Sequence, residues 1–133
     1  MSERPRILVS NDDGYQSEGI KALVDAMEEL GEVWVVAPEV EQSASSHAIS
    51  IHRPLRLREV RPRWYAVDGT PTDCAWLGIH HVLKGRRPSL AVSGINHGPN
   101  AGALLALSGT VGAALAGAVL LDPPIPGIAL NAA

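Results

Sequence analysis

The sequence predicts an α/β fold with a mostly parallel sheet that is covered on both faces. Short runs of strand-forming residues alternate with stretches of helical periodicity along the 133-residue chain. The strand-like runs are continuously apolar, which is typical of parallel strands buried on both sides. Residues 7–37 contain a strand, a helix and a second strand, and such a unit has a right-handed crossover.

The first strand, residues 7–9, ends in a turn that carries two adjacent carboxylates. The turn is Asn11 to Gly14, and the acids are Asp12 and Asp13. In open α/β sheets, ligands bind at the carboxyl ends of the strands. Asp-Asp-Gly alone is most often a solvated turn, and paired carboxylates either raise a pKa, stay hydrated or bind a cation. We favour the cation.

The first helix is predicted from Ser17 onward, with Gly31 as its stop, because apolar residues recur there at helical spacing. Glu32 to Ala37 is the second buried strand, ended by Pro38. The polar loop over residues 38–47 then emerges at the same edge as the paired carboxylates. Its hydroxyls and amide either complete a cation site, hold a phosphate or only form a loop.

The middle of the chain predicts a short β-hairpin and a second helix. Residues 47–51 and 55–60 alternate apolar with polar residues around a turn, and residues 64–67 form another strand. Thr72 or Asp73 is expected to cap a helix that runs to about Leu83.

Ser89 to Ser93 is a further buried strand, followed by a glycine-rich segment over residues 94–102. That segment is either a flexible turn or an anion-binding nest of backbone N–H groups. An apolar helix is then predicted from Ser108-Gly109-Thr110 to about Leu121. Its first residues either bind a phosphate or only cap the helix N-terminus. Residues 127–130 form the last strand.

Composition restricts the class of protein. The net charge of −3 gives no general attraction to nucleic acid polymers or anionic membranes. The start of the chain lacks a signal-peptide core, and no run reaches the roughly 20 apolar residues of a membrane span. With a single cysteine, Cys74, these features predict a cytoplasmic protein. The arginines at residues 53–63 form either a solvated strand face or a substrate-attracting surface.

Five short motifs occur in a fixed order. They are Asn11-Asp12-Asp13-Gly14; Ala37-Pro38 followed by Gln42-Ser43; Asp68-Gly69-Thr70-Pro71-Thr72-Asp73-Cys74; Ser93-Gly94-Ile95-Asn96 with Gly98, Asn100 and Gly102; and Ser108-Gly109-Thr110-Val111. In order and spacing they resemble the SurE survival-protein family, over residues 7–130. The resemblance implies a Rossmann-like three-layer α/β/α fold with a mostly parallel sheet and a short β-hairpin excursion.

The resemblance also implies a metal-dependent phosphatase that hydrolyses nucleoside 5'- and 3'-monophosphates, assembled as a homo-oligomer, a dimer or a tetramer. The implied ligands of one divalent cation, Mg²⁺ or Mn²⁺, are Asp12, Asp13, Ser43 and Asn96. The implied phosphate-binding residues are Asn96, Ser108, Gly109 and Thr110. Asp12, Asp13 and Asn96 are the implied catalytic residues, and the sequence does not choose which aspartate helps accept a proton.

Two departures from the family pattern favour an alternative. Residues 103–107 and Ala116 are apolar where the family carries acidic and aromatic residues. We also expect residues 1–133 to form one SurE-like domain without the family's usual C-terminal region. The alternative is a catalytically silent phosphate- or nucleotide-binding module of the same fold. A dinucleotide-dependent dehydrogenase is disfavoured, because Asp-Asp-Gly stands where the glycine fingerprint would be.

Overall fold

A mostly parallel sheet forms the centre of the computed structural model, which describes residues 4–40, 54–97 and 125–132. Over these residues the sheet has six strands in the order β3-β4-β2-β1-β5-β6. Only β3 and β4 pair antiparallel. The strands are β1 (Arg6–Ser10), β2 (Glu32–Pro38), β3 (Leu57–Arg61), β4 (Trp64–Val67), β5 (Leu90–His97) and β6 (Gly127–Ala132).

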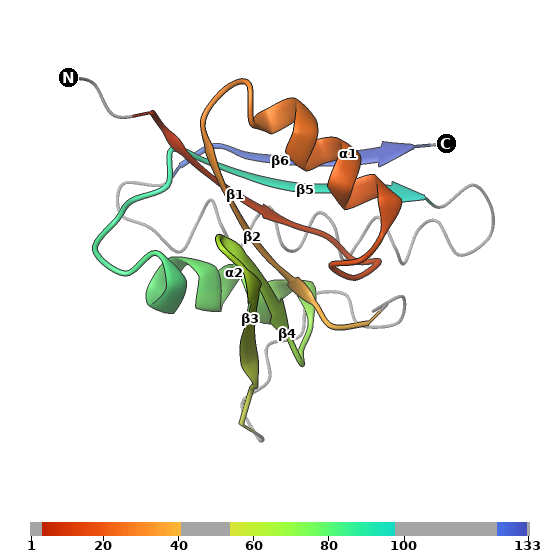
Figure 1. Ribbon diagram of the computed structural model, residues 1–133, viewed down its shortest axis with the longest axis vertical. Helices are drawn as coiled ribbons and strands as arrows, with labels where there is room; N and C mark the ends of the chain where they lie inside the picture. Colours follow the sequence, from red (N-terminus) through yellow and green to blue (C-terminus); the bar gives the residue numbers. More distant parts are fainter. Residues whose placement is uncertain (1–3, 41–53, 98–124, 133) are drawn as a thin grey trace.

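Helices cover both faces of the sheet, which confirms the three-layer α/β/α prediction (Figure 1). Helix α1 (Glu18–Met27) packs on one face through a core that contains Ile7, Val9 and Ile20. Helix α2 (Pro71–Leu77) continues into a π-helical turn, η1 (Gly78–Val82), and packs on the other face against Leu8 and Val36. Within the described part of the chain, no helix is long and apolar enough to cross a membrane.

The strand order reverses between β1 and β5. From β1 the chain moves to β2 and β4 on one side, and later to β5 and β6 on the other. This is a Rossmann-like topology, and the carboxyl ends of the two strands at the reversal are where ligands bind in such folds. The described segments therefore place the loop after β1 and the end of β5 at the expected ligand position.

Helix α1 begins as predicted and ends earlier than predicted. The Ser17 hydroxyl caps it by accepting from Ile20 N at 3.3 Å. The helix ends at Met27, so the expectation that Gly31 would stop it was wrong. Leu30, which lies beyond the end of the helix at the same helical spacing, is exposed and contributes nothing to the core. Gly31 is instead needed for close packing, since a Cβ there would overlap the Pro5 carbonyl oxygen.

Helix α2 has a different cap from the one predicted. Thr70, rather than Thr72 or Asp73, is the N-cap residue: its hydroxyl accepts from Asp73 N at 3.1 Å. The Asp73 carboxylate accepts in return from Thr70 N at 2.9 Å, which completes a capping box. Pro71 favours this start because it lacks an N–H and fits the first helical position. At Gly78 the helix widens into η1, which ends at Val82 with Leu83 as its C-cap, in agreement with the predicted end at about Leu83.

The observed β-hairpin joins β3 and β4, with its turn at Pro62 and Arg63. Arg63 adopts a left-handed backbone with φ of 64°, which closes the tight connection. The predicted strands at residues 55–60 and 64–67 are therefore confirmed, with β3 shifted towards Arg61. Residues 47–51, the other half of the predicted hairpin, lie outside the described residues.

Strand β5 is longer than predicted. The glycine-rich segment was expected to leave the sheet at Gly94, but β5 continues to His97 and its register against β6 shifts between Ser93 and Asn96. Gly94 has φ of 142°, and a Cβ there would overlap the Leu130 carbonyl oxygen. Residues 98–102 and the predicted helix from Ser108 to Leu121 lie outside the described residues. The last strand is confirmed and runs to Ala132.

Candidate functional site

The loop after β1 is held by its first residue, Asn11. This side chain is fully buried. Its amide Nδ2 donates to the Gly14 carbonyl oxygen at 2.8 Å and to the Ser17 hydroxyl at 2.9 Å, and Gly14 N donates back to Asn11 Oδ1 at 3.1 Å. These bonds close a tight turn around Asp12 and Asp13 and link it to the N-cap of α1. The carboxylates therefore stand on a backbone that is already ordered.

The two carboxylates differ in their exposure to solvent. Asp12 is 0% exposed, whereas Asp13 is partly exposed. A buried carboxylate requires compensating hydrogen-bond donors or a cation nearby. Two adjacent carboxylates, one of them shielded from water, are the oxygen donors that Mg²⁺ and Mn²⁺ prefer. The donor chemistry at the end of β1 therefore fits a hard divalent cation.

Strand β5 brings Asn96 to the same edge of the sheet. Ser10 of β1 lies beside Ser93 of β5, and both strands run in the same direction past this pair. The backbone of Asn96 pairs with Asn131 at the end of β5. Helix α1 is held against this strand end at Gly19, where a Cβ would overlap the Ile95 carbonyl oxygen. The loop of Asp12 and Asp13 and the backbone of Asn96 thus lie at one edge of the sheet.

Four other predicted site residues, Ser43, Ser108, Gly109 and Thr110, lie outside the described residues. Their roles, and that of the Asn96 side chain, remain predictions. In the segments that the structure describes, no group of three or more His, Cys, Asp or Glu residues is arranged to hold a metal ion. The predicted ligands Ser43 and Asn96 would add hydroxyl and amide oxygens to the two carboxylates, which also suit a hard divalent cation.

Sequence reasoning missed a polar network beside the loop. Tyr15 N donates to the Pro38 carbonyl oxygen at 2.9 Å, which ties the loop after β1 to the end of β2. The Arg58 guanidinium donates to the Tyr15 hydroxyl at 3.2 Å and to Glu39 Oε1 at 2.7 Å. These bonds to Tyr15 and Glu39 raise the pKa of Arg58. The only sequence signal was the run of arginines, of which Arg58 is one.

Cys74 and the two helix histidines are not part of the site. Burial, and secondarily the nearby Asp73, raise the pKa of the Cys74 thiol well above its ordinary value, so Cys74 is a neutral core residue at neutral pH. His80 lies against the Trp76 ring with centroids 4.8 Å apart, and His81 is exposed. These positions give Cys74 a structural role in the core and leave His80 and His81 on the surface.

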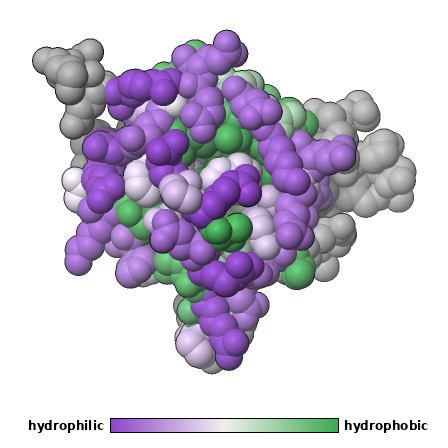
Figure 2. Space-filling model, in the orientation of Figure 1, coloured by the Kyte–Doolittle hydropathy of each residue, from purple (hydrophilic) through white to green (hydrophobic). Residues whose placement is uncertain are grey.

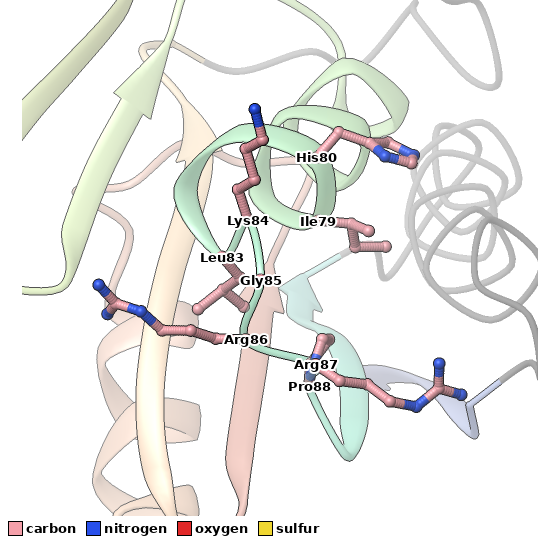
Figure 3. A pocket seen from close by; sticks show the side chains of 8 residues that line it. All are labelled: Ile79, His80, Leu83, Lys84, Gly85, Arg86, Arg87 and Pro88. Carbon is pink, nitrogen blue, oxygen red and sulfur yellow. The ribbon is translucent and has the colours of Figure 1, made fainter.

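A basic pocket lies at the opposite edge of the sheet, between η1 and the start of β5 (Figure 3). It has a volume of about 410 Å³, and its lining includes His80, Lys84, Arg86 and Arg87. The labelled side chains of Lys84, Arg86 and Arg87 point in different directions. Arg86 also lies over the Trp34 ring, 5.4 Å from its centroid. These cations do not converge on one ligand position.

The surface seen from the side of Figure 1 is mostly hydrophilic (Figure 2). Hydrophobic residues form small separate patches among the polar ones on this face. Three arginines in and beside the hairpin, Arg56, Arg58 and Arg61, are exposed. Arg61 lies over the Trp64 ring, 4.0 Å from its centroid. The prediction of a solvated strand face therefore holds for Arg61, whereas Arg58 is engaged in the network beside the loop.

The family of this chain follows from its similarity to known proteins. The family model described as "Survival protein SurE" matches residues 7–133. The chain belongs to the SurE family. It is 67% identical over 126 residues to "5'-nucleotidase SurE" from Myxococcus xanthus, covering 94% of this chain and 48% of that protein. It is 66% identical over 115 residues to the same-named protein from an Anaeromyxobacter species, covering 86% of this chain and 45% of the relative.

A solved SurE structure supports the fold. The SurE protein from Aquifex aeolicus matches with a TM-score of 0.85 and 43% sequence identity, over 96% of this chain and 50% of that chain. The chain thus spans about half the length of the SurE proteins that it matches. The Rossmann-like fold predicted from the sequence motifs is confirmed.

Proposed function

We propose that this SurE chain contributes the cation- and phosphate-binding part of a metal-dependent phosphomonoesterase, which hydrolyses nucleoside 5'- and 3'-monophosphates to nucleoside and phosphate. The observation that carries the proposal is the buried Asp12, next to Asp13, at the reversal point of the sheet. The names of the matched relatives, "5'-nucleotidase SurE", support the reaction class. We further propose a cytoplasmic location and a homo-oligomeric state.

The residues of the chain have distinct roles in this proposal. Asp12, Asp13, Ser43 and Asn96 would hold one Mg²⁺ or Mn²⁺, which supplies electrostatic stabilisation of the charge that develops on the phosphoryl oxygens. Asn96, with the Ser108, Gly109 and Thr110 segment, would orient the phosphate. Asp12 or Asp13 would accept the proton of the attacking water. Asn11 holds both aspartates on one tight turn, so their spacing is fixed before the substrate arrives.

The test is phosphate release from adenosine 5'-monophosphate and from an aryl phosphate, with Mn²⁺ and with chelator. We expect release that requires the metal and falls by at least about 100-fold in Asp12→Asn. Asp25→Asn, which removes an exposed acid on α1, is the matched control and retains wild-type activity. Full metal-dependent turnover in Asp12→Asn would show that the site is elsewhere.

The departures at residues 103–107 and Ala116 favour the silent binding module as the second candidate. The same experiment separates the two functions. A folded wild-type chain that binds Mn²⁺ and inorganic phosphate by calorimetry, yet releases no phosphate from either substrate, supports the binding module.

A further inference from the structure

A second pocket lies at the same edge of the sheet as the paired carboxylates. It has a volume of about 470 Å³ and is lined by Glu39, Val40, Arg56, Arg58 and Asp68. Glu39 follows β2 and Asp68 follows β4, so both lie at carboxyl ends of parallel strands. Arg56 precedes the antiparallel β3, which brings the start of that strand to the same edge.

The frame of this pocket is set by hydrogen bonds. Glu39 N donates to the Val67 carbonyl oxygen at 2.8 Å, and Asp68 N donates to the Arg56 carbonyl oxygen at 3.0 Å. The Arg58 side chain is held in place, because its Nε and its terminal nitrogen both donate to Glu39 Oε1, at 3.1 and 2.7 Å. The Arg58 and Glu39 side chains are therefore held in place before a ligand binds, which reduces the entropic cost of binding.

The position of the pocket matches what a substrate of the proposed reaction requires. The register of β1 against β2 pairs Val9 with Val35, and continuing it places Asp12 level with Pro38. Pro38 in turn lies beside Val67 of β4. Two strand spacings, about 10 Å in total, separate the carboxylate loop from the end of β4. A group attached to a phosphate at the end of β1 can extend across β2 into this pocket.

The charges of the pocket favour a neutral polar occupant. Two guanidinium groups, from Arg56 and Arg58, stand with two carboxylates, from Glu39 and Asp68, and Val40 adds an exposed apolar surface. Such a lining offers hydrogen-bond donors and acceptors without excess charge of either sign, and so does not select a second phosphate. In dinucleotide-binding Rossmann folds, an acid in the region corresponding to Glu39 contacts a ribose hydroxyl.

We propose that this pocket is the nucleoside subsite of the enzyme. The ribose hydroxyls bind to the carboxylate and guanidinium groups at the ends of β2 and β4, and the base lies against Val40 and the Arg58 plane. This inference rests on the proposed function, because it assumes that the phosphate binds at the end of β1. It assigns substrate discrimination to Arg56 and Asp68, neither of which is among the site residues that the family resemblance implies.

The test compares adenosine 5'-monophosphate with phenyl phosphate, which carries the phosphate without the nucleoside. We expect Arg56→Ala and Asp68→Asn each to raise KM for adenosine 5'-monophosphate by about 5- to 10-fold, the effect of losing one hydrogen bond. KM for phenyl phosphate changes by less than about twofold in the same variants. Arg61→Ala is the matched control: it removes an arginine from the same hairpin, outside the pocket and over Trp64.

The outcomes separate the subsite from the reaction itself. Equal KM changes for the two substrates, or none for either, overturn the nucleoside subsite and leave the phosphatase intact. If the wild-type chain hydrolyses neither substrate, the proposed function fails, and calorimetric titration with adenosine 5'-monophosphate decides the subsite. Wild-type binding that Arg56→Ala and Asp68→Asn weaken and Arg61→Ala preserves supports it. Absent binding, or binding unaffected by these variants, overturns it.

Discussion

Asn11 and Gly14 exchange hydrogen bonds across the turn that presents the two carboxylates: Asn11 Nδ2 donates to the Gly14 carbonyl oxygen, and Gly14 N donates to Asn11 Oδ1. The Asn11 side chain thus supplies a hydrogen-bond acceptor for the buried Gly14 N–H and a second donor for the Gly14 carbonyl oxygen. We expect Asn11→Ala to lower the free energy of unfolding by about 1 to 3 kcal/mol, because it leaves the buried Gly14 N without its acceptor. It also removes one of two donors to the Gly14 carbonyl oxygen, which still accepts from Ser17 N at 3.2 Å. Denaturant unfolding measures the loss.

The control for Asn11→Ala is Gln16→Ala, which changes an exposed residue in the same loop. It is expected to leave stability within about 0.5 kcal/mol of wild type. A loss in Asn11→Ala no larger than in Gln16→Ala contradicts a structural role for the exchange.

Metal binding is expected to stabilise the folded chain, since the paired carboxylates bind the ion only when the loop after β1 is formed. Mn²⁺ at about 100 times its dissociation constant adds about 2.7 kcal/mol to the free energy of unfolding. The melting temperature therefore rises with Mn²⁺ and returns to its starting value with chelator. Asp13→Asn removes this response, whereas Asp25→Asn, on α1, keeps it. A rise of equal size in Asp13→Asn would place the ion elsewhere.

The buried Cys74 thiol makes the free energy of unfolding fall as the pH becomes alkaline. Because burial raises the pKa of its thiol in the folded chain, the unfolded chain loses this proton first as the pH increases. The stabilising contribution is complete below the unfolded thiol pKa of about 8.5 and is lost above it, by at most about 1.4 kcal/mol per pH unit. Unfolding measured between about pH 7.5 and 9.5 should show a decline that Cys74→Ala flattens.

The pH window in this experiment is limited by Tyr65. Desolvation, and secondarily Glu59, raise the pKa of its phenol in the folded chain. The free energy of unfolding therefore falls again as the pH rises past about 10, where the phenol of the unfolded chain ionises. An equally steep decline in Cys74→Ala below that pH contradicts the assignment to the thiol.

Alanine substitutions at two glycines with positive φ, Gly85 and Gly94, distinguish the cost of backbone strain from the cost of steric overlap. Gly85 has φ of 77°, and a Cβ at this position would have no atom within 4 Å, so Gly85→Ala should cost only the strain, about 1 kcal/mol. Gly94→Ala places its Cβ against the Leu130 carbonyl oxygen, and should cost more than about 3 kcal/mol because backbone must move. If denaturant unfolding shows equal losses of stability in the two variants, β5 and β6 can move apart at little cost, which contradicts the prediction.

Local pattern was sufficient to predict the central strands and the start of α1. The apolar runs of β1 and β2 are bounded by turn residues, and Ser17 is the first residue before α1 that can cap it. The start of α2 was harder, since Thr70, Thr72 and Asp73 are all competent caps. Pro71 decides among them, because its position within the first turn requires the cap to precede it.

The candidate site could be predicted only in part. Asp12 and Asp13 follow a recognisable strand, so their place at the ligand edge follows from sequence. The contact of Arg58 with Tyr15 does not, because it joins residues 43 positions apart and depends on β3 occupying the far edge of the sheet. The continuation of β5 through Gly94 was missed for a similar reason: glycine indicated a turn, whereas the neighbouring strand β6 requires it.

The close approach of Gly19 to Ile95 determines how near α1 lies to the end of β5. The N-terminal turn of α1 rests on the end of β5, and the same turn is bonded to the loop after β1 through Asn11 and Ser17. The distance between α1 and the end of β5 therefore depends on the absence of a side chain at Gly19. A methyl group at this position would push α1, and the carboxylate loop bonded to it, away from β5. In the proposed cation site, the larger separation would favour Ca²⁺ over the smaller Mg²⁺.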